Sequence, residues 1–289
     1  MRYLHVDVFS SQPYSGNSLT VFLNPAAAPL SGRQMIRVTQ EMRHFESVFL
    51  TQDASTDRRW HARVFDLVEE LDFAGHPLIG AACVLHALHG VEDTETWCLA
   101  LKARTVDVTT RRRAEGRYTA VLDQGPAAFF GEPDIPELAA WFSLEADDLH
   151  PCLPPEVLST GLRYLIVPVQ GDALERARIA QDLEALLAAR GAQFAYLLDA
   201  AALEGRHWTN DGNLEDVATG SGAGCAAAYL RRHGRIGDGE VVTLHQGRLT
   251  GRASEMVISA HGEGGDIRSV TVGGEVAFVA EGHLRELPA

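Results

Sequence analysis

Short runs in which apolar and polar residues alternate recur along the whole chain, and this period of two is typical of β-strands. The runs follow one another closely, which favours mainly antiparallel sheets. They are YLHVDVF near the start, TVDVTT and YTAVLD in the middle, and EVVTLHQ, EMVISA and SVTVGG towards the end.

Two segments have the period of a helix instead. Within residues 31–44, Met35, Val38 and Met42 recur at spacings that place them on one helical face, and the serine at the start can cap the helix. We therefore expect an amphipathic helix here and a second one over residues 172–190. In the second helix the apolar face comprises Leu174, Ala177, Leu183, Leu186 and Leu187.

Two alanine-rich stretches, each entered through glycines, indicate an internal repeat. LDFAGHPLIGAACVLHALHG (residues 71–90) can be laid over EDVATGSGAGCAAAYLRRHG (residues 215–234) without a gap, at an offset of 144 residues, so that Asp72 matches Asp216. The preceding strands SGNSLTVFL and TGLRYLIVPV match at an offset of 145. In both halves a strand, an amphipathic helix, a second strand, a glycine loop and a central helix follow in the same order.

This repeat predicts an α+β protein of two pseudo-symmetric lobes, each with a mainly antiparallel sheet wrapped on a central helix. Both central helices begin at their glycine loops, so two helix N-termini would face a cleft between the lobes. Pro77 suits the first turn of the first helix, with His76 as its N-cap, and Thr219 or Ser221 can cap the second. Such N-termini bind a carboxylate, or an oxyanion that develops during a reaction.

The glycines of the second stretch do not have the spacing of a nucleotide-binding loop. A Walker loop ends in Gly-Lys-Ser/Thr, and ATGSGAGCAAA contains no lysine. Gly220, Gly222 and Gly224 also lack the spacing of a Rossmann fingerprint. We therefore interpret the two loops together as an anion-binding active site.

The composition mainly excludes kinds of partner, location and site. The 289 residues are 46% hydrophobic and carry a formal net charge of −14, which disfavours nucleic acids and anionic membranes as partners. No apolar run reaches the roughly 20 residues of a membrane span, and the first residues resemble a strand rather than a signal peptide, so a cytoplasmic location is expected. The four cysteines form no CxxC pair and have no metal-ligand spacing to histidines, so neither a metal site nor a disulfide framework is expected.

Six motifs, taken in order, resemble a known family. They are VDVFSSQPYSGNSLTVFL, MRHFESVFL, ELDFAGHPLIGAA, STGLRYLIVPV, LEDVATGSGAG and HQGRLTGRASEM. Together they are similar to the PhzF-like isomerases of phenazine biosynthesis, which have the diaminopimelate epimerase and proline racemase fold. The resemblance implies a barrel-like sheet in each lobe, with residues 1–118 and 277–289 in the N-terminal lobe and residues 119–276 in the C-terminal lobe. It also implies a homodimer and no cofactor.

The resemblance also assigns the site residues. The catalytic base maps onto Glu46, with His76 and Asp216 as further catalytic residues. Glu46 lies in the apolar run HFESVFL, where a carboxylate should have a raised pKa and be able to carry a proton near neutral pH. The substrate, a small carboxylate, would be bound by Gly75, Gly220, Ser221, Asn17 and Thr219, of which the two glycines contribute backbone amides.

Proton transfer by one carboxylate is the chemistry that these residues favour. Glu46 would remove a proton from carbon, the helix N-termini would hold the resulting anion, and the same acid would return the proton elsewhere. No cysteine stands at the start of either central helix, which excludes the two-thiol mechanism of the related epimerases.

Several family positions are changed in this sequence, and they leave the substrate open. The function hypothesis is a cofactor-independent isomerase that moves a proton and a double bond on a small unsaturated, cyclic, amino-acid-like carboxylate in secondary metabolism. The alternatives are a one-base epimerase of a small amino acid and a non-catalytic protein that binds small acids. The changed positions are Ser18, Phe45, Asp66, Leu67, Val217 and residues 207–210.

Overall fold

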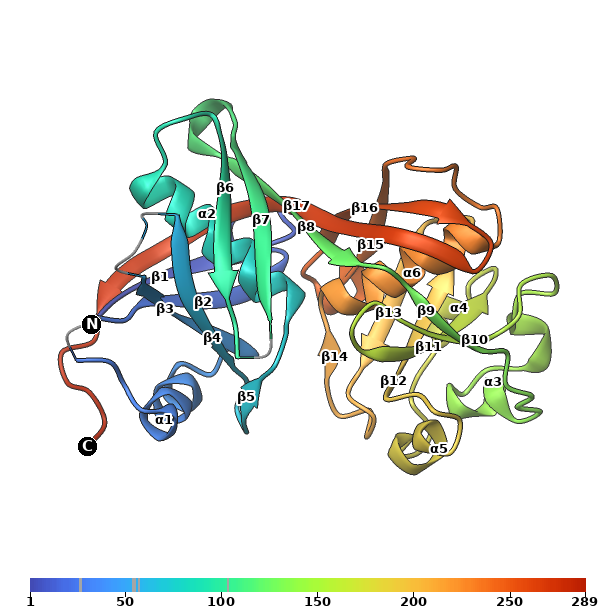
Figure 1. Cartoon of the computed structure of the whole chain (residues 1–289). Helices are drawn as coiled ribbons and strands as arrows, with labels where there is room; N and C mark the ends of the chain where they lie inside the picture. Colours follow the sequence, from blue (N-terminus) through green and yellow to red (C-terminus); the bar gives the residue numbers. More distant parts are fainter. Residues whose placement is uncertain (26–27, 54–55, 57, 103) are drawn as a thin grey trace. The chain divides into compact units, whose positions relative to one another are not determined.

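The chain folds into two compact units, each consisting mainly of β-strands around one long helix (Figure 1). Within the part of the chain that is described, no helix combines the length and the apolar character needed to cross a membrane. The computed structural model describes residues 1–25, 28–53, 56, 58–102 and 104–289. The first unit comprises Met1–Asp123 and Gly273–Ala289, and the second comprises Gln124–Val272.

Strands of the first unit pair side by side into a closed ring. Its members are β1 (Arg2–Val8), β2 (Asn17–Leu23), β3 (Glu46–Gln52), β4 (Arg59–Phe65), β6 (Thr94–Ala100), β7 (Thr105–Arg112), β8 (Tyr118–Gly125) and β17 (Asp266–His283). In this order each strand pairs with the next, and β17 pairs again with β1, which closes the ring. The short strand β5 (Glu70–Leu71) pairs antiparallel with the end of β4, just before the central helix.

Helix α2 (Gly75–His89) is the central helix of this ring and contacts β1, β2, β3, β6 and β7. Residues 75–86 are all buried, as expected for a helix that is apolar on every side. Gly80 permits this close packing, because a Cβ there would lie within 2.9 Å of the Val8 side chain. Helix α1 (Gly32–Met42) begins at Ser31, whose side chain forms the expected N-cap within a capping box.

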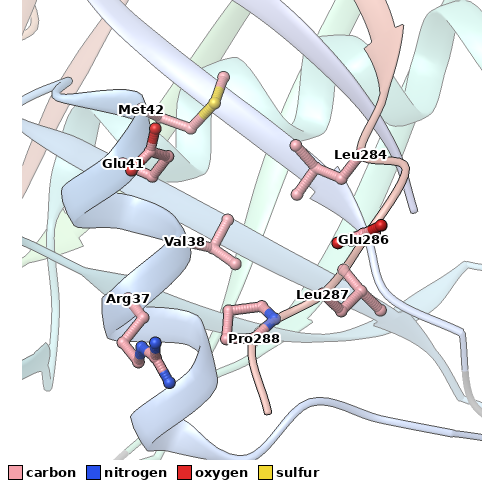
Figure 2. Close-up of a pocket in the computed structure, with 8 residues that line it drawn as sticks. All are labelled: Arg37, Val38, Glu41, Met42, Leu284, Glu286, Leu287 and Pro288. Atoms are coloured by element: carbon pink, nitrogen blue, oxygen red, sulfur yellow. The ribbon is translucent and has the colours of Figure 1, made fainter.

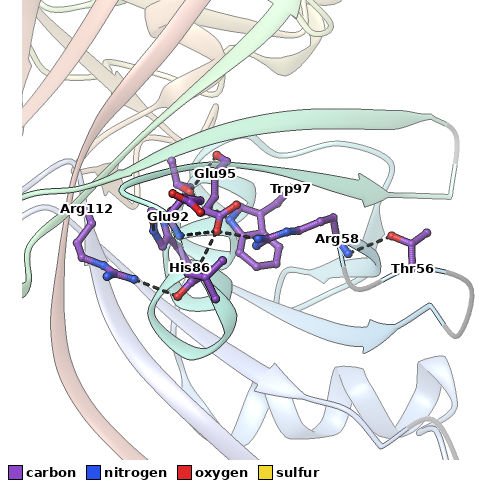
Figure 3. A network of polar contacts seen from close by, with 10 residues as sticks. Thr56, Arg58, His86, Glu92, Glu95, Trp97 and Arg112 are labelled. Carbon is purple, nitrogen blue, oxygen red and sulfur yellow. Dashed lines mark hydrogen bonds and ion pairs between the residues drawn. The ribbon is translucent and has the colours of Figure 1, made fainter.

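A network of polar groups fixes the C-terminal end of α2 (Figure 3). The carboxylate of Glu95, which is 7% exposed, accepts hydrogen bonds from Arg58 at 2.7 Å and from the backbone N–H of Glu92 at 3.1 Å. On the helix itself, His86 contacts the Thr110 hydroxyl at 2.7 Å and the Glu92 carbonyl at 3.0 Å. These bonds attach the hairpin of β6 and β7 to the helix that they cover.

The second unit repeats this plan around helix α6 (Gly220–Arg232), which contacts β10, β11 and β16. Pairing runs from β9 through β10, β11, β12, β13, β15 and β16 to β17, and the Ala127 N–H bonds the Ile267 carbonyl at 3.0 Å, which links the start of β9 back to β17. The strands are β9 (Ala128–Gly131), β10 (Glu156–Ser159), β11 (Arg163–Val169), β12 (Phe194–Asp199), β13 (Glu204–Trp208), β14 (Glu215–Asp216), β15 (Val242–Gln246) and β16 (Ser254–Glu263), and the shorter helices are α3 (Leu138–Trp141), α4 (Ala173–Arg176) and α5 (Glu184–Ala188).

Strand directions confirm the expected fold class. In the first unit, β2–β3 and β4–β6 are parallel pairs, and β11–β12 and β13–β15 are the parallel pairs at the same steps of the second unit. Most remaining pairs are antiparallel. The protein is therefore an α+β fold with a mainly antiparallel sheet around a central helix in each half.

Strand registers correct the alignment of the two halves. The short strands before the central helices end at Leu71 and Asp216, and the helices begin at Gly75 and Gly220. Both pairs differ by 145 residues, so Asp216 corresponds to Leu71 rather than to Asp72. The gapless overlay at 144 was wrong because it matched glycines and alanines, which recur throughout both helices and coincide at several offsets.

The single helix expected over residues 172–190 is also wrong, because α4 and α5 are separate. Between them the backbone bonds to distant groups. The Ala180 N–H donates to the Trp141 carbonyl at 2.9 Å, and the guanidinium of Arg206 donates to the Ala177 carbonyl at 3.2 Å. Such bonds replace the helical pattern, and hydrophobic periodicity carries no information about them.

Candidate active site

The predicted site residues fall into two sets, one in each unit. In the first unit, Glu46 is the first residue of β3 and His76 is the second residue of α2. Strand and helix place the Glu46 Oε2 atom 3.5 Å from the His76 Nδ1 atom. Their side chains are 19% and 8% exposed, so this polar contact is largely buried.

The imidazole of His76 is neutral near pH 7. Burial lowers the pKa of His76 to about 3, because the charged form would lose its hydration. The contact with Glu46 is therefore a polar contact with a neutral ring rather than an ion pair. The Nε2 atom of His76 is buried and has no hydrogen-bond partner among the described residues, which leaves it available to a ligand.

The N-terminus of α2 differs in one respect from expectation. Ala74 is the N-cap and makes no side-chain hydrogen bond, so the prediction that His76 caps this helix was wrong. The His76 side chain is directed to Glu46 instead. Pro77 lies in the first turn, as expected, and that turn contains no acidic residue. The positive end of the helix dipole is therefore not offset by a carboxylate of its own turn.

Asn17 lies on β2, the strand that pairs with the strand of Glu46 in the first unit. It begins β2 and is 1% exposed. In the parallel pair of β2 and β3, Glu46 lies opposite Leu19, two residues beyond Asn17. Because side chains two residues apart share one face of a strand, Asn17 and Leu19 point to the same side.

In the second unit, Asp216 and Thr219 form one hydrogen-bonded group. The Thr219 hydroxyl donates to Asp216 Oδ2 at 2.7 Å. Gln246 holds both residues, because its amide nitrogen donates to the Asp216 carbonyl at 2.8 Å and its amide oxygen accepts from the Thr219 N–H at 3.2 Å. Tyr196 donates its hydroxyl to the same amide oxygen at 3.0 Å. Sequence reasoning missed Gln246, although it lies in the motif HQGRLTGRASEM.

Neither candidate caps α6 with its side chain. Thr219 occupies the N-cap position, but its hydroxyl bonds to Asp216 instead. Ser221 is the second residue of the helix, after Gly220, and its Oγ atom lies 2.8 Å from the hydroxyl of Tyr164. Thr219 is therefore at the predicted N-cap position, but the prediction of a side-chain cap was wrong, because each hydroxyl has another partner.

An arginine–glutamate pair supports the approach to each central helix. Arg63 of β4 forms a two-point ion pair with Glu70 of β5, at 2.8 and 2.6 Å. Arg206 of β13 forms the same pair with Glu215 of β14, at 2.8 and 2.7 Å. Each pair ties a two-residue strand to its neighbour and thereby fixes the loop that enters the helix.

Glu46 has no carboxylate counterpart in the second unit. Glu46 begins β3 and pairs with Leu19 of β2. At the same step, Phe194 begins β12 and pairs with Tyr164 of β11. The two units are therefore built alike, but only the first has an ionisable side chain at this position.

At the end of the short strand before the central helix, by contrast, the second unit has an acidic residue and the first does not. Asp216 of the second unit corresponds to Leu71 of the first, and Ser221 corresponds to His76. The acidic groups thus stand at different steps of the repeat in the two units. A mechanism with two equivalent groups related by the repeat does not fit this arrangement.

The cysteines lie away from the helix entrances. Cys83 and Cys225 are buried inside α2 and α6. Burial raises the pKa of Cys83, and it raises the pKa of Cys225 to about 12, so both thiols are protonated near neutral pH. Among the described residues, no group of three or more His, Cys, Asp or Glu side chains is arranged to hold a metal ion.

A pocket of about 250 Å³ lies elsewhere in the first unit (Figure 2). It lies where α1 meets the segment after β17, and none of the predicted site residues lines it. Both elements contribute apolar and charged side chains to its lining. The lining residues are Arg37, Val38, Glu41, Met42, Leu284, Glu286, Leu287 and Pro288.

Comparison with known sequences identifies the family. The model of the phenazine biosynthesis-like proteins matches residues 6–282, and the chain belongs to this family of PhzF-type isomerases. It is 34% identical to the trans-2,3-dihydro-3-hydroxyanthranilate isomerase of Pseudomonas aeruginosa, over 97% of this chain and 98% of that protein. The protein of the same name from Pseudomonas chlororaphis is 31% identical, over 98% and 99% of the two chains.

Solved structures agree with this assignment. A protein of Pseudomonas aeruginosa described as a predicted epimerase is 44% identical and superposes with a TM-score of 0.90, over 99% of both chains. A PhzF-family protein of Bacillus anthracis shares the fold, with a TM-score of 0.82 and 21% identity over 98% of both chains. A probable proline racemase from Agrobacterium radiobacter also shares it, with a TM-score of 0.63 and 14% identity over 98% and 92% of the two chains.

Proposed function

We propose that the protein is a cofactor-independent isomerase that moves a proton, and with it a double bond, on a small cyclic carboxylate, with Glu46 as both base and acid. The observation that carries this proposal is the buried contact of Glu46 with neutral His76 at the start of α2. Phe194 at the corresponding position of the second unit favours one base over two.

The proposed reaction has two proton transfers. In the first, the Glu46 carboxylate removes a proton from a carbon next to an unsaturated system, and the electron pair of that C–H bond enters the conjugated system. In the second, protonated Glu46 returns the proton to another carbon of the same system, and the double bond is left in its new place. The substrate and product are isomers, so no electron acceptor or further reactant is consumed.

The negative charge that develops between the two steps needs hydrogen-bond donors. We assign this role to the backbone N–H groups of Gly75 and Gly220 at the two helix N-termini, where the helix dipole favours an anion. His76, through its Nε2 atom, and the hydroxyl of Ser221 would bind polar groups of the substrate. Asp216, held by Thr219 and Gln246, would fix a hydroxyl or amino group. Asn17 would line the substrate site beside Glu46.

The curated relatives suggest the first substrate to test. Proteins named trans-2,3-dihydro-3-hydroxyanthranilate isomerase are 34% and 31% identical to this chain along almost its full length. We propose that this chain acts on that compound or on another small unsaturated cyclic amino acid. Val217, one of the changed family positions, adjoins Asp216, and this change lies where it can alter the preference among such substrates.

Proton exchange with the solvent tests the proposal directly. The wild-type protein is incubated with trans-2,3-dihydro-3-hydroxyanthranilate in deuterated water, and the product is followed by NMR. Glu46→Gln should lower kcat by about 10²- to 10⁴-fold, the usual contribution of a general acid–base. Glu41→Gln, on the exposed face of α1, is the matched control and should leave kcat unchanged. Deuterium incorporation that persists in Glu46→Gln would remove Glu46 from the role of base.

One observation favours a second candidate, a one-base epimerase, because the 44% identical solved structure is described as a predicted epimerase. Epimerisation would incorporate deuterium at one stereocentre and change the optical rotation without shifting a double bond. Chiral chromatography of small amino acids, combined with the ultraviolet spectrum of the same samples, separates the two candidates. Calorimetric binding without any exchange of deuterium would instead favour a non-catalytic protein that binds small acids.

A further inference from the structure

Tyr164 makes a contact in the second unit that is similar to the Glu46–His76 contact of the first, although Tyr164 matches Leu19 and therefore lies on the other strand of the parallel pair. Ser221 stands at the second position of α6, as His76 does in α2. The Tyr164 hydroxyl lies 2.8 Å from Ser221 Oγ. In both units, therefore, a polar side chain from the parallel strand pair contacts the second residue of the central helix.

The ring of Tyr164 is held in place on two sides. The side chain is 2% exposed, and its ring centroid lies 5.4 Å from that of Phe194 and 5.6 Å from that of His207. His207 is itself fixed, because its Nδ1 atom lies 2.8 Å from the Ala195 carbonyl oxygen, which can only accept. A ring packed in this way cannot turn away from Ser221, so the direction of the phenol oxygen is set by the fold.

We propose that Tyr164 is a positioning residue that donates its phenol proton to Ser221 Oγ, so that the Ser221 hydroxyl is left to donate to an anionic oxygen of the substrate. This inference rests on the proposed function, in which Ser221 binds the substrate. Of the two hydroxyls, only Ser221 belongs to the helix N-terminus, where N–H groups favour an anion. A hydroxyl that accepts a hydrogen bond is polarised and donates more strongly. The proposed hydrogen bonds therefore run in one direction, from Tyr164 to Ser221 and from Ser221 to the substrate.

Tyr164→Phe removes the phenol oxygen and keeps the packed ring. We expect kcat/KM for trans-2,3-dihydro-3-hydroxyanthranilate to fall about five- to tenfold, the effect of one hydrogen bond. The matched control is Tyr229→Phe, because Tyr229 is also fully buried, lies on α6, and donates its hydroxyl to the Pro154 carbonyl at 2.7 Å. Both variants lose one buried hydroxyl, but only Tyr164→Phe should change the kinetics.

A double-variant cycle separates positioning from a general structural effect. Tyr164→Phe combined with Ser221→Ala should be within about twofold of Ser221→Ala alone, because Tyr164 acts only through that hydroxyl. Effects that multiply would show that Tyr164 acts independently and would overturn the inference. Equal kinetic losses in Tyr164→Phe and Tyr229→Phe would also overturn it, because they would reveal only a loss of packing.

Failure of this inference can be distinguished from failure of the proposed function. If Ser221→Ala lowers kcat/KM and Tyr164→Phe does not, Ser221 binds substrate without help from Tyr164, and only the inference fails. If the wild-type protein converts neither this compound nor a panel of other small unsaturated cyclic amino acids, and does not bind 3-hydroxyanthranilate in a calorimeter, the proposed function fails, and the inference fails with it. If Tyr164→Phe raises KM or the dissociation constant of 3-hydroxyanthranilate while the Tyr229→Phe control does not, the inference is supported.

Discussion

Breaking the ion pair of Arg206 with Glu215 is expected to destabilise the protein far more than breaking the equivalent pair of Arg63 with Glu70. The perturbations are Glu215→Gln and Glu70→Gln, which keep the shape of the side chain and remove its charge. The two pairs have the same geometry and the same place in the repeat. The two pairs can therefore be compared directly, because they differ mainly in how deeply their side chains are buried.

The magnitude follows from exposure. The Arg206 and Glu215 side chains are 4% and 15% exposed, whereas those of Arg63 and Glu70 are 37% and 21% exposed. Removing one partner of a buried pair leaves a charge without compensation and costs about 3 to 5 kcal/mol, whereas exposed pairs contribute about 1 kcal/mol or less. Arg206 also donates to the carbonyls of Leu174 and Ala177, which partly compensate its charge. We expect a loss of about 3 kcal/mol for Glu215→Gln and about 1 kcal/mol for Glu70→Gln.

Urea unfolding at neutral pH measures both losses, with circular dichroism for the whole chain and tryptophan fluorescence as a second probe. Trp208 reports on the buried pair itself, because the Arg206 guanidinium lies 4.3 Å from its ring. In a thermal scan, Glu215→Gln should lower the midpoint by on the order of 10 °C. Equal losses for the two variants, or a loss below about 1 kcal/mol for Glu215→Gln, would refute the argument from burial.

Two further predictions concern protonation. Burial lowers the pKa of His76 from 6.5 to about 3. Below pH 6.5 the unfolded chain takes up a proton at His76 that the folded protein does not, so the stability present above pH 6.5 is lost as the pH falls towards 3. His76→Asn should flatten the pH dependence of the free energy of unfolding by up to about 1.4 kcal/mol per pH unit between about pH 6 and pH 4, measured by urea titrations, and an unchanged slope would contradict this. Iodoacetamide at about pH 8 should label the exposed Cys152 and spare Cys83 and Cys225, as read by peptide mass spectrometry; labelling of either buried thiol in the folded protein would contradict it.

The order of the elements could be predicted from the sequence because local patterns determine it. Apolar alternation marks the strands, and the cap of α1 depends only on Ser31 and Gln34, which are three residues apart. The repeat could also be recognised, because its members follow in the same order in both halves. The exact correspondence could not, since glycine and alanine fit several offsets and only strand register separates 144 from 145.

The groups that support the candidate site could not be predicted from the sequence, for a different reason. Gln246 contacts Asp216 and Thr219 across about 30 residues, and Tyr164 contacts Ser221 across 57. Neither contact produces a periodic pattern, because each depends on the register of strands that are distant in sequence. The resemblance to a family predicted which residues form the candidate site, but it did not predict which groups hold those residues in place.

The closed ring of the first unit has a consequence for how the chain folds as it is synthesised. In that ring Arg2 pairs with His283, so the first unit needs residues from both ends of the chain. The second unit is one continuous segment, residues 124–272, and can complete its contacts before β17 is finished. Until then β1 and β8 have unpaired edges, which are sites for aggregation. The first unit begins earlier in the sequence but closes after the second unit. Its exposed strand edges are covered only when β17 pairs with β1 and β8.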